Sequence, residues 1–496
     1  MTARTLISLL PQLILLLTAL ILLGINLIRG DDKRTHGWLP GVALVGLAGA
    51  VVAIVYLWTT TPPAPPHPIL GKMLLVDPFA LFLQLIAVAA TALVIMLSAG
   101  YMRSRTADPG EFYALLLIAC LAITLVTAAT DLLMIYVSLE MLSITSYILT
   151  GYFYEDIKST EAGVKYFLFG ATMSAAMLYG MSLFYGIART TNLVAIAQGL
   201  SGPETSLRGL VTPALIFLLA GFGFKIAAVP FHQWAPDAYE GAPTPITAFL
   251  SIGPKVAGFA VLLRTLLIAL PHFYADWVIL LSSISIITMI VGNLLAIFQR
   301  DVKRMMAYSS IAHAGYMLIG VACWTQGNPP GPFDGLSGVL IYLLAYLFGN
   351  VGTFVVIVAL EEATGSCQIE DYAGLVSRSP LLAAAMLIFM LSLAGIPGTG
   401  GFMGKLYVFG AAINVRAYAL AVAGIITSVI AAFYYLNLLR YAFFQPPEDM
   451  SPIPVSAGIK VALTITGLLT LVLGLYAQPF LQLAQRTAHC LNGAPF

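Results

Sequence analysis

The chain has 496 residues, of which 60% are hydrophobic and only 9% are charged, and its formal net charge is +1. Soluble proteins carry charged side chains at roughly 25% of their positions, so this composition excludes a soluble fold and indicates an all-α polytopic membrane protein. The charges nearly balance and no long basic run occurs, so we expect no nucleic-acid partner.

A membrane crossing needs about 20 apolar residues, and on that basis we predict fourteen spans. They lie at residues 6–28, 39–58, 78–101, 112–129, 131–153, 163–187, 211–229, 243–269, 276–298, 302–323, 336–360, 380–411, 416–443 and 457–482. An even number of spans puts both termini on one side of the membrane.

Positive charges in the loops predict the orientation, because cytoplasmic loops carry an excess of Lys and Arg. One set of alternate loops, which includes Lys33, Arg34 and Lys303, holds eleven such residues. The other set, which includes both termini, holds seven, and Arg264 is assigned to one of its loops. We therefore predict that the first set is cytoplasmic and that both termini lie on the outer face.

Four lysines and one glutamate lie deep inside predicted spans, where a charge at mid-bilayer costs about 2.5 to 3.5 kcal/mol on insertion scales. They are Glu140, Lys165, Lys225, Lys255 and Lys405. All four cations are lysines, which can lose a proton when removed from water, whereas arginine stays charged. The pattern therefore indicates proton movement, with fixed ion pairs as the alternative.

Glu140 lies nine residues into the fifth span, near mid-membrane, and Lys225 in the seventh span is its expected partner. An ion pair that forms and breaks during turnover could act as a switch, whereas a permanent ion pair would only lock two helices together. Lys165 lies a few residues inside the sixth span, so its ammonium could instead reach the membrane surface.

Two predicted spans are interrupted by glycine and proline, which break helices. The first runs LAGFGFKIAAVPFH and contains Lys225; the second runs LAGIPGTGGFMGK and contains Lys405. Irregular backbone at membrane depth is tolerated where it lines a cavity, and paired broken helices indicate an internally repeated transporter. The breaks fall in spans seven and twelve, which predicts two inverted five-span repeats.

These repeats divide the chain into four parts. We predict an N-terminal three-helix segment at 1–110, a first repeat of spans 4–8 at 111–270, a second repeat of spans 9–13 at 271–445, and a C-terminal span at 446–496.

Three further groups complete the candidate site. Lys255 follows Pro254 in the eighth span, where the proline frees backbone groups near the ammonium. His313 lies halfway along the tenth span, and an imidazole can gain and lose a proton near neutral pH; a hydrogen-bonded core histidine is the alternative. His232, just past the first break with Asp237 and Glu240, is interpreted as part of a loop-anchoring network, with an ion entrance as the alternative.

Cofactor sites are not indicated. The four cysteines, Cys120, Cys323, Cys367 and Cys490, stand singly without a CxxC pair, whereas iron–sulfur clusters and structural zinc need grouped cysteines. No glycine-rich nucleotide loop follows a strand, and the six histidines are widely spaced. We expect no metal or redox cofactor in this chain.

Several stretches around these residues resemble one family, the antiporter-like membrane subunits of respiratory complex I, which are related to subunits of multisubunit Na+/H+ antiporters. The matching stretches are SLEMLSITSYIL, EAGVKYFLFGA, GFGFKIAAVPFHQWAPDAYEGAPTPITAFLS, GPKVAGF, RDVKRMMAYSSIAHAGY and LAGIPGTGGFMGKLYVF. The lysine on the second broken helix differs from the glutamate of M-type subunits, and no long lateral helix follows as in L-type subunits. The stretch EAGVKYF and the overall length resemble the N-type subunit, which is called chain 2 in many organisms.

The resemblance implies a proton-translocating role in NADH:quinone oxidoreductase. Glu140 and Lys225 would form the switch, Lys255 and His313 the central relay, and Lys405 the exit or the link to the next subunit, while the role of Lys165 is less settled. FMN, iron–sulfur clusters and quinone would be bound by partner subunits, among which the M-, K- and J-type membrane subunits would be neighbours. The location would be the bacterial cell membrane, that is, the inner or plasma membrane.

Three alternatives remain open on the sequence. The first is a subunit of a Na+/H+ antiporter or membrane-bound hydrogenase with the same fold. The second is a stand-alone solute transporter, which would need a substrate pocket. The third is a structural scaffold, which would leave the cost of five buried ionisable groups unexplained.

Overall fold

The structure is a computed structural model that describes residues 3–29, 37–60, 68–103, 105, 109–200, 208–325, 332–447 and 449–492. Lys33 and Arg34, which entered the predicted orientation, lie outside these residues. The α-helices are α1 Ala3–Ser8, α2 Leu10–Arg29, α3 Leu39–Thr60, α4 Pro78–Arg103, α5 Pro109–Ala128, α6 Leu132–Thr150, α7 Ile157–Ala188, α8 Leu193–Leu200, α9 Val211–Ile226, α10 Trp234–Gly241, α11 Thr244–Arg264, α12 Tyr274–Ile297, α13 Val302–Ala322, α14 Gly335–Thr364, α15 Leu375–Arg378, α16 Pro380–Ala394, α17 Gly400–Asn414, α18 Tyr418–Phe444, α19 Ala457–Leu475 and α20 Gln478–Asn492.

The predicted helical membrane fold is confirmed, but the number of fourteen spans is not. Within the described residues, twelve helices are long and apolar enough to cross a membrane, and α9 and α16 are shorter apolar helices. These two shorter helices belong to the two broken spans. The last predicted span, 457–482, is also divided, because α19 ends at Leu475 and α20 begins at Gln478.

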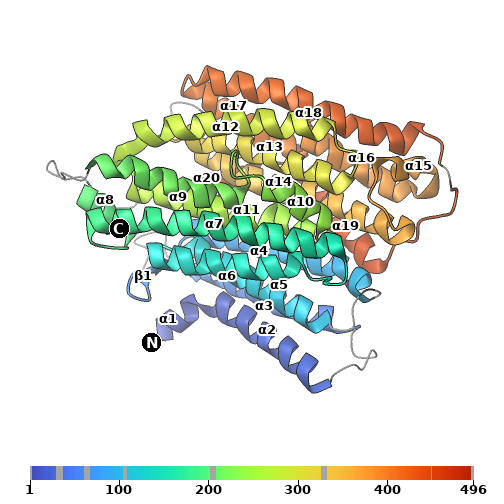
Figure 1. The fold of residues 1–496 in the computed structure, drawn as a ribbon, viewed down its shortest axis with the longest axis horizontal. Helices are drawn as coiled ribbons and strands as arrows, with labels where there is room; N and C mark the ends of the chain where they lie inside the picture. The colour runs from blue at the N-terminus through green and yellow to red at the C-terminus, as the bar shows by residue number, and fades with distance from the viewer. Residues whose placement is uncertain are drawn as a thin grey trace.

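The helices run roughly side by side along one direction (Figure 1). Helix α11 lies at the centre, with all 21 of its residues buried, and α14 beside it is buried along most of its length. Helices α2, α7, α12 and α18 lie on the outside and present large apolar side chains outward. Apolar side chains can face lipid as favourably as a protein core, so this outer surface suits a bilayer.

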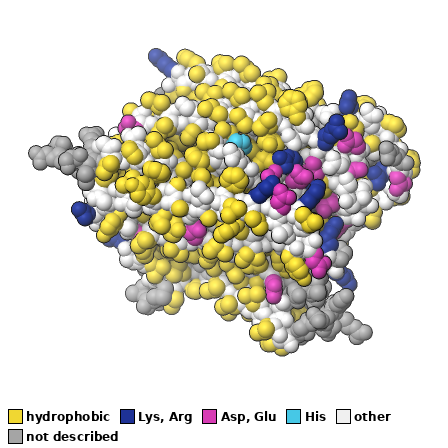
Figure 2. All heavy atoms as spheres, in the orientation of Figure 1, with side chains coloured by type: hydrophobic (Ala, Val, Ile, Leu, Met, Phe, Trp, Pro, Cys, Tyr) yellow, Lys and Arg dark blue, Asp and Glu magenta, His cyan; other side chains and the backbone are white. Residues whose placement is uncertain are grey.

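Charged side chains are grouped on the face shown in Figure 2. Most of that face is hydrophobic, but lysines or arginines and acidic side chains gather right of its centre. In Figure 1, β1 and α8 lie toward the left end of the bundle, whereas α10 and α15 lie toward the right. The charge cluster is therefore displaced toward the end of the bundle opposite β1 and α8.

The only strands among the described residues are two short ones, which the sequence did not predict. Strand β1 (Pro68–Ile69) pairs antiparallel with β2 (Leu74–Leu75). This hairpin lies just before α4 and leaves the helical architecture unchanged.

Both predicted helix breaks are present, and they differ in form. Helix α9 ends at Ile226, where Ala227 adopts a left-handed conformation (φ 57°), and the chain turns into the short helix α10. Helix α16 ends at Ala394, Gly395 has φ 87°, and α17 begins five residues later at Gly400. Each break leaves the last carbonyl groups of a helix without helical partners, because those groups have no following turn.

Candidate functional site

Lys225 and Glu140, the predicted partners, do not contact each other directly in this structure. The Glu140 carboxylate accepts a hydrogen bond of 2.5 Å from Ser174 on α7, and Lys225 Nζ donates one of 2.5 Å to Ser143 Oγ on α6. Glu140 is partly exposed at the side of the bundle, whereas Lys225 is buried. Because Ser143 lies one helical turn after Glu140, the two charged groups are neighbours that are separated by a hydroxyl.

Lys255 is held by the first helix break. Its Nζ donates hydrogen bonds to the carbonyl of Ile226, the last residue of α9, at 3.3 Å, and to the carbonyl of Ser310 on α13 at 2.8 Å. The side chain is 1% exposed, and no ion pair among the described residues includes it. The break therefore supplies an acceptor to a lysine on another helix.

Lys405 is held by the second break in the same manner. Its Nζ donates to the carbonyls of Leu393 and Ala394 at the end of α16, both at 2.9 Å, and to Ser428 Oγ at 2.7 Å. The residue is 4% exposed. Carbonyl groups at a helix C-terminus carry partial negative charge, so they stabilise the ammonium without a carboxylate.

His313 lies on α13 between these two lysines. It follows Ser310, which binds Lys255, by three residues, and it precedes Tyr316, whose ring centre is 5.1 Å from Lys405 Nζ, by three residues. Residues three apart lie on the same face of a helix. One face of α13 therefore connects the Lys255 site to the Lys405 site.

A cluster of hydroxyl and amide groups surrounds His313, and the sequence reasoning missed it. The imidazole Nδ1 lies 2.8 Å from the Tyr342 hydroxyl and Nε2 lies 3.1 Å from the Tyr435 hydroxyl. Nearby, Asn293 Nδ2 donates to the Tyr316 hydroxyl at 2.9 Å. The available signal was the occurrence of asparagine and tyrosine in the middle of apolar spans, where a polar group needs a partner.

Lys165 is not buried inside the helix bundle. Helix α7 begins at Ile157, and the Lys165 side chain is 41% exposed and bonded to Glu161 at 2.7 Å and to Asp237 at 2.9 Å. The side chain therefore lies on the outside of the helix bundle, and the alternative that its ammonium reaches the membrane surface stays a prediction. Lys165 joins a surface network and not the buried row.

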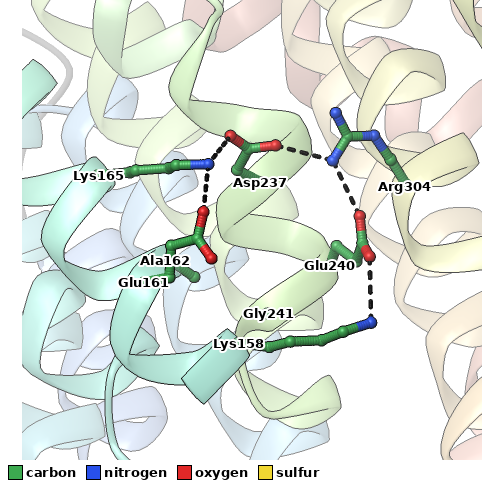
Figure 3. A pocket seen from close by; sticks show the side chains of 8 residues that line it. All are labelled: Lys158, Glu161, Ala162, Lys165, Asp237, Glu240, Gly241 and Arg304. Carbon is green, nitrogen blue, oxygen red and sulfur yellow. Dashed lines mark hydrogen bonds and ion pairs between the residues drawn. The ribbon is translucent and has the colours of Figure 1, made fainter. Parts of the chain in front are cut away.

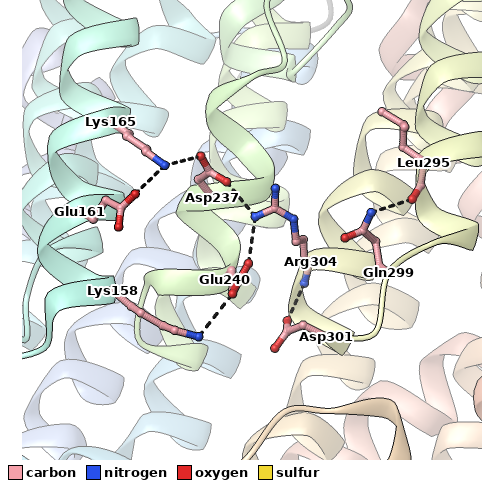
Figure 4. A network of polar contacts seen from close by, with 9 residues as sticks. All are labelled: Lys158, Glu161, Lys165, Asp237, Glu240, Leu295, Gln299, Asp301 and Arg304. Atoms are coloured by element: carbon pink, nitrogen blue, oxygen red, sulfur yellow. Dashed lines mark hydrogen bonds and ion pairs between the residues drawn. The ribbon is translucent and has the colours of Figure 1, made fainter.

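This network, which we call the charged pocket, encloses a cavity of about 220 Å³. Its charged residues are Lys158, Glu161, Lys165, Asp237, Glu240 and Arg304 (Figure 3). They alternate in sign: Asp237 connects Lys165 to Arg304, and Glu240 connects Arg304 to Lys158. The chain of contacts joins α7, α10 and α13 (Figure 4). Asp237 and Glu240 thus anchor α10.

His232, which precedes α10, does not join this network. Its Nδ1 atom is buried without a hydrogen-bond partner.

The pKa of Asp237 reflects its place in the charged pocket. Partial burial disfavours the carboxylate, but the hydrogen bonds from Lys165 and Arg304 outweigh this effect and hold the pKa of Asp237 below its usual value. The ionised form of Asp237 therefore contributes to the connection between α7, α10 and α13.

Arg264 corrects the prediction that this residue lies in a loop. It is the last residue of α11, its side chain is fully buried, and Nη2 donates to Asp77 Oδ1 at 2.6 Å. The guanidinium also donates from Nε to the Thr127 carbonyl at 2.9 Å and lies over the Phe79 ring. Lys303, which was also assigned to a loop, is buried and donates to the Ala242 carbonyl at 2.8 Å.

Within the described ranges, no group of three or more His, Cys, Asp or Glu side chains is arranged to hold a metal ion. The four cysteines are free thiols.

The comparisons with known proteins fit this geometry. Residues 129–431 match the family model for the membrane part of NADH:quinone oxidoreductase and Mrp antiporters. The chain is 41% identical to NADH-quinone oxidoreductase subunit N of Trichlorobacter lovleyi, covering 96% of this chain and 95% of that relative. The chain belongs to this family.

Three further proteins are similar to this chain. NAD(P)H-quinone oxidoreductase subunit 2 of Thermosynechococcus vestitus is 41% identical, with 96% of this chain and 92% of the relative covered. A chain of respiratory complex I from Thermus thermophilus matches with a TM-score of 0.79 and 32% identity, covering 95% of this chain and 98% of that one. A chain of the Mrp complex from a Dietzia species matches with a TM-score of 0.85 over 99% and 98% of the two chains; at 22% identity this similarity shows the fold alone.

Proposed function

We propose that this chain is the N-type antiporter-like subunit of a proton-translocating NADH:quinone oxidoreductase. It moves protons across the membrane while other subunits transfer electrons from NADH to quinone. One observation supports this most directly: the buried ammonium groups of Lys255 and Lys405 are bound by backbone carbonyls, which include those at the ends of α9 and α16, and not by carboxylates. Carbonyl dipoles stabilise the charged form, but no fixed counter-ion has to be left unpaired when the proton leaves.

The relay in this proposal follows α13. Lys255 shares a proton pathway with His313 and then with Lys405, and the hydroxyls of Tyr342 and Tyr435 fix the imidazole between them. A histidine that is not hydrogen-bonded to a carboxylate can change its protonation without breaking an ion pair. The tyrosine hydroxyls can both donate and accept, so they can follow such a change.

Glu140 and Lys225 form the proposed switch. In this structure they bind Ser174 and Ser143, which represents the separated arrangement of the pair. While the two side chains are apart, the positive charge of Lys225 repels the ammonium of Lys255 and favours transfer of its proton; movement of either side chain toward the other would weaken this repulsion. Lys165 contributes only at the surface end of the pathway, because it lies in the charged pocket.

The setting of the subunit follows from the same proposal. The chain holds no redox group; FMN, iron–sulfur clusters and quinone belong to partner subunits, and the M-, K- and J-type membrane subunits are its neighbours. The protein lies in a bacterial inner membrane, with the charged pocket on the cytoplasmic side and both termini outside. The chain is divided into four parts at 1–110, 111–270, 271–445 and 446–496. In this division, each of the two inverted repeats, 111–270 and 271–445, contains one broken helix.

A subunit of a Na+/H+ antiporter or hydrogenase is the weaker alternative. The Mrp chain is similar at only 22% identity, whereas the quinone oxidoreductase subunits reach 41%.

The proposal is tested with Lys255→Met in the intact complex, reconstituted into liposomes. We expect normal assembly, with fewer protons moved per NADH oxidised. Lys460→Met, which changes an exposed lysine on α19, is the matched control. Wild-type coupling in Lys255→Met would overturn the proposal.

A further inference from the structure

A second cavity lies next to the charged pocket and reaches a different part of the bundle. We call it the mouth pocket; its volume is about 280 Å³, and its lining includes Tyr101, Pro243, Asp301, Lys303 and Glu361. It shares Lys158, Glu240 and Gly241 with the charged pocket. The two cavities therefore open at the same end of the bundle, and the mouth pocket extends to α4 and α14.

Glu361 connects the mouth pocket to the interior. Its side chain is 14% exposed, and one carboxylate oxygen accepts a hydrogen bond from the Tyr101 hydroxyl at 3.0 Å while the other accepts a short one from Thr244. Arg105 lies 3.7 Å away. Thr244 is the first residue of α11, so this carboxylate touches the start of the helix that carries Lys255.

One face of α11 carries polar side chains from the mouth pocket to Lys255. Thr244, Thr247, Ser251 and Lys255 follow at intervals of three, four and four residues, and none is more than 1% exposed. This spacing places them on the same side of the helix. Eleven residues at about 1.5 Å each span roughly 16 Å, which is half the thickness of a bilayer core.

Helix α14 faces this row with polar groups of its own. Asn350 Nδ2 donates to Ser251 Oγ at 2.5 Å, while the fully buried Oδ1 of Asn350 has no partner. One turn earlier, the buried hydroxyl of Tyr346 also has no partner, and its ring centre lies 5.0 Å from that of His313. Buried polar atoms without partners are commonly satisfied by internal water.

We propose that the contact between α11 and α14, from Glu361 through Thr244, Thr247, Ser251 and Asn350, is the proton-uptake route to Lys255 and His313. This inference rests on the proposed function and adds a specific route and collecting residue to it. The Glu361 carboxylate takes a proton from water in the mouth pocket and passes it to the hydroxyl row. Each hydroxyl or bridging water accepts one proton and releases another, so no bond to carbon changes.

Water can complete this row. Side chains on successive helical turns are about 5 to 6 Å apart, and two hydrogen bonds of about 2.8 Å joined at one water cover that distance. The unpartnered oxygens of Asn350 and Tyr346 supply acceptors or donors for such waters at the inner end. A purely structural role of Glu361, as a clamp between α4, α11 and α14, explains its own bonds but not these buried unpartnered atoms.

The experiment uses the intact complex in liposomes with Glu361→Gln, Glu361→Asp and Thr247→Val. The readouts are assembly, NADH:quinone turnover, protons moved per NADH, and the solvent deuterium isotope effect on proton uptake. Glu361→Gln keeps hydrogen-bonding capacity but cannot ionise; we expect fewer protons per NADH and a larger isotope effect at normal assembly, with recovery in Glu361→Asp. Thr247→Val should give the same loss, because valine has the shape of threonine without its hydroxyl.

Two matched controls separate the outcomes. Glu362→Gln changes the neighbouring, exposed carboxylate, and Thr91→Val changes a buried threonine on α4 that donates to the Ala87 carbonyl of its own helix; both should behave as wild type. If Lys255→Met loses coupling while Glu361→Gln and Thr247→Val do not, the uptake route is wrong and the proposed function stands. If Lys255→Met also couples normally, the proposed function itself fails.

Discussion

Lys405 Nζ and the carbonyl oxygen of Ala394 lie 2.9 Å apart across the second helix break. The carbonyl has no partner within its own helix because α16 ends at Ala394, and the ammonium reaches it from α17. Lys255 and Ile226 repeat the relationship at the first break, at 3.3 Å. The breaks thus do more than open the backbone: each one converts a helix end into a binding site for a cation from another helix.

Replacing Lys405 by arginine should preserve assembly and abolish the contribution of this chain to proton movement. Arginine can bind the same carbonyls but does not release its proton in proteins. The measurement is the number of protons moved per NADH by the reconstituted complex. Wild-type coupling in Lys405→Arg would show that this position does not exchange a proton.

Glu140→Gln should lower proton movement while leaving the complex assembled. The amide can still accept the hydrogen bond from Ser174, but it has no charge to bias Lys225. Glu111→Gln, an exposed acidic residue in the first turn of α5, provides the comparison. Equal coupling in the two variants would remove Glu140 from the switch.

Gly401→Ala should disturb the second break and displace Lys405. A Cβ at Gly401 would overlap the carbonyl oxygen of Ser392 on α16, whereas one at Gly467 on α19 would meet open space. We therefore expect Gly401→Ala to reduce assembly or coupling strongly and Gly467→Ala to have no effect. Native electrophoresis and the proton-to-NADH ratio report the two effects separately, and a fully coupled Gly401→Ala complex would refute this explanation of the break.

Loss of the buried Asp77–Arg264 pair should destabilise the chain severely when only one partner is removed. An unpaired buried charge costs about 3 to 5 kcal/mol, so Arg264→Met should lower the amount of assembled complex. The double variant Asp77→Leu with Arg264→Met should recover part of the loss, because no charge is left alone. Thermal inactivation of the solubilised complex ranks the stability of the single and double variants. Equal loss of stability in Arg264→Met and in the double variant would contradict this explanation.

Asp237→Asn should lower the thermal stability of the complex at neutral pH by a small amount. Partial burial by itself raises the folded-state pKa of Asp237, but the hydrogen bonds from Lys165 and Arg304 have the larger effect, so that the pKa is lowered overall. A lowered pKa means that the ionised form favours the folded state; this contribution is present above the unfolded value of about 3.9 and is lost as the pH falls through the folded value.

The difference between wild type and Asp237→Asn should therefore stay constant from neutral pH down to about 4 and shrink below it. Because these groups are partly exposed, we expect an effect of about 1 kcal/mol or less. Asp276→Asn, an exposed acidic residue in the first turn of α12, should show no such dependence. A difference that grows as the medium becomes more acidic would contradict the role of the carboxylate.

The amino-acid sequence alone determined the membrane class, most helix positions, the two breaks and the buried lysines at 225, 255 and 405. These features follow from local physics, because apolar length, glycine and proline, and the cost of a buried charge act on neighbouring residues. Partners could not be determined in this way. The sequence predicted that Glu140 and Lys225 are partners, but it could not predict that Ser174 binds Glu140 and that Ser143 binds Lys225.

Tertiary structure also decided which charges are buried. Lys165 was expected to be buried and lies on the outside of the bundle, where it binds Asp237 of α10. Arg264 was counted among the loop residues and is enclosed, where it binds Asp77, the residue just before α4. The tyrosines around His313 come from helices 29 and 122 residues away in the chain. Burial and hydrogen bonding depend on which helices meet, and a pattern along one helix contains no information on the side chains that another helix places opposite it.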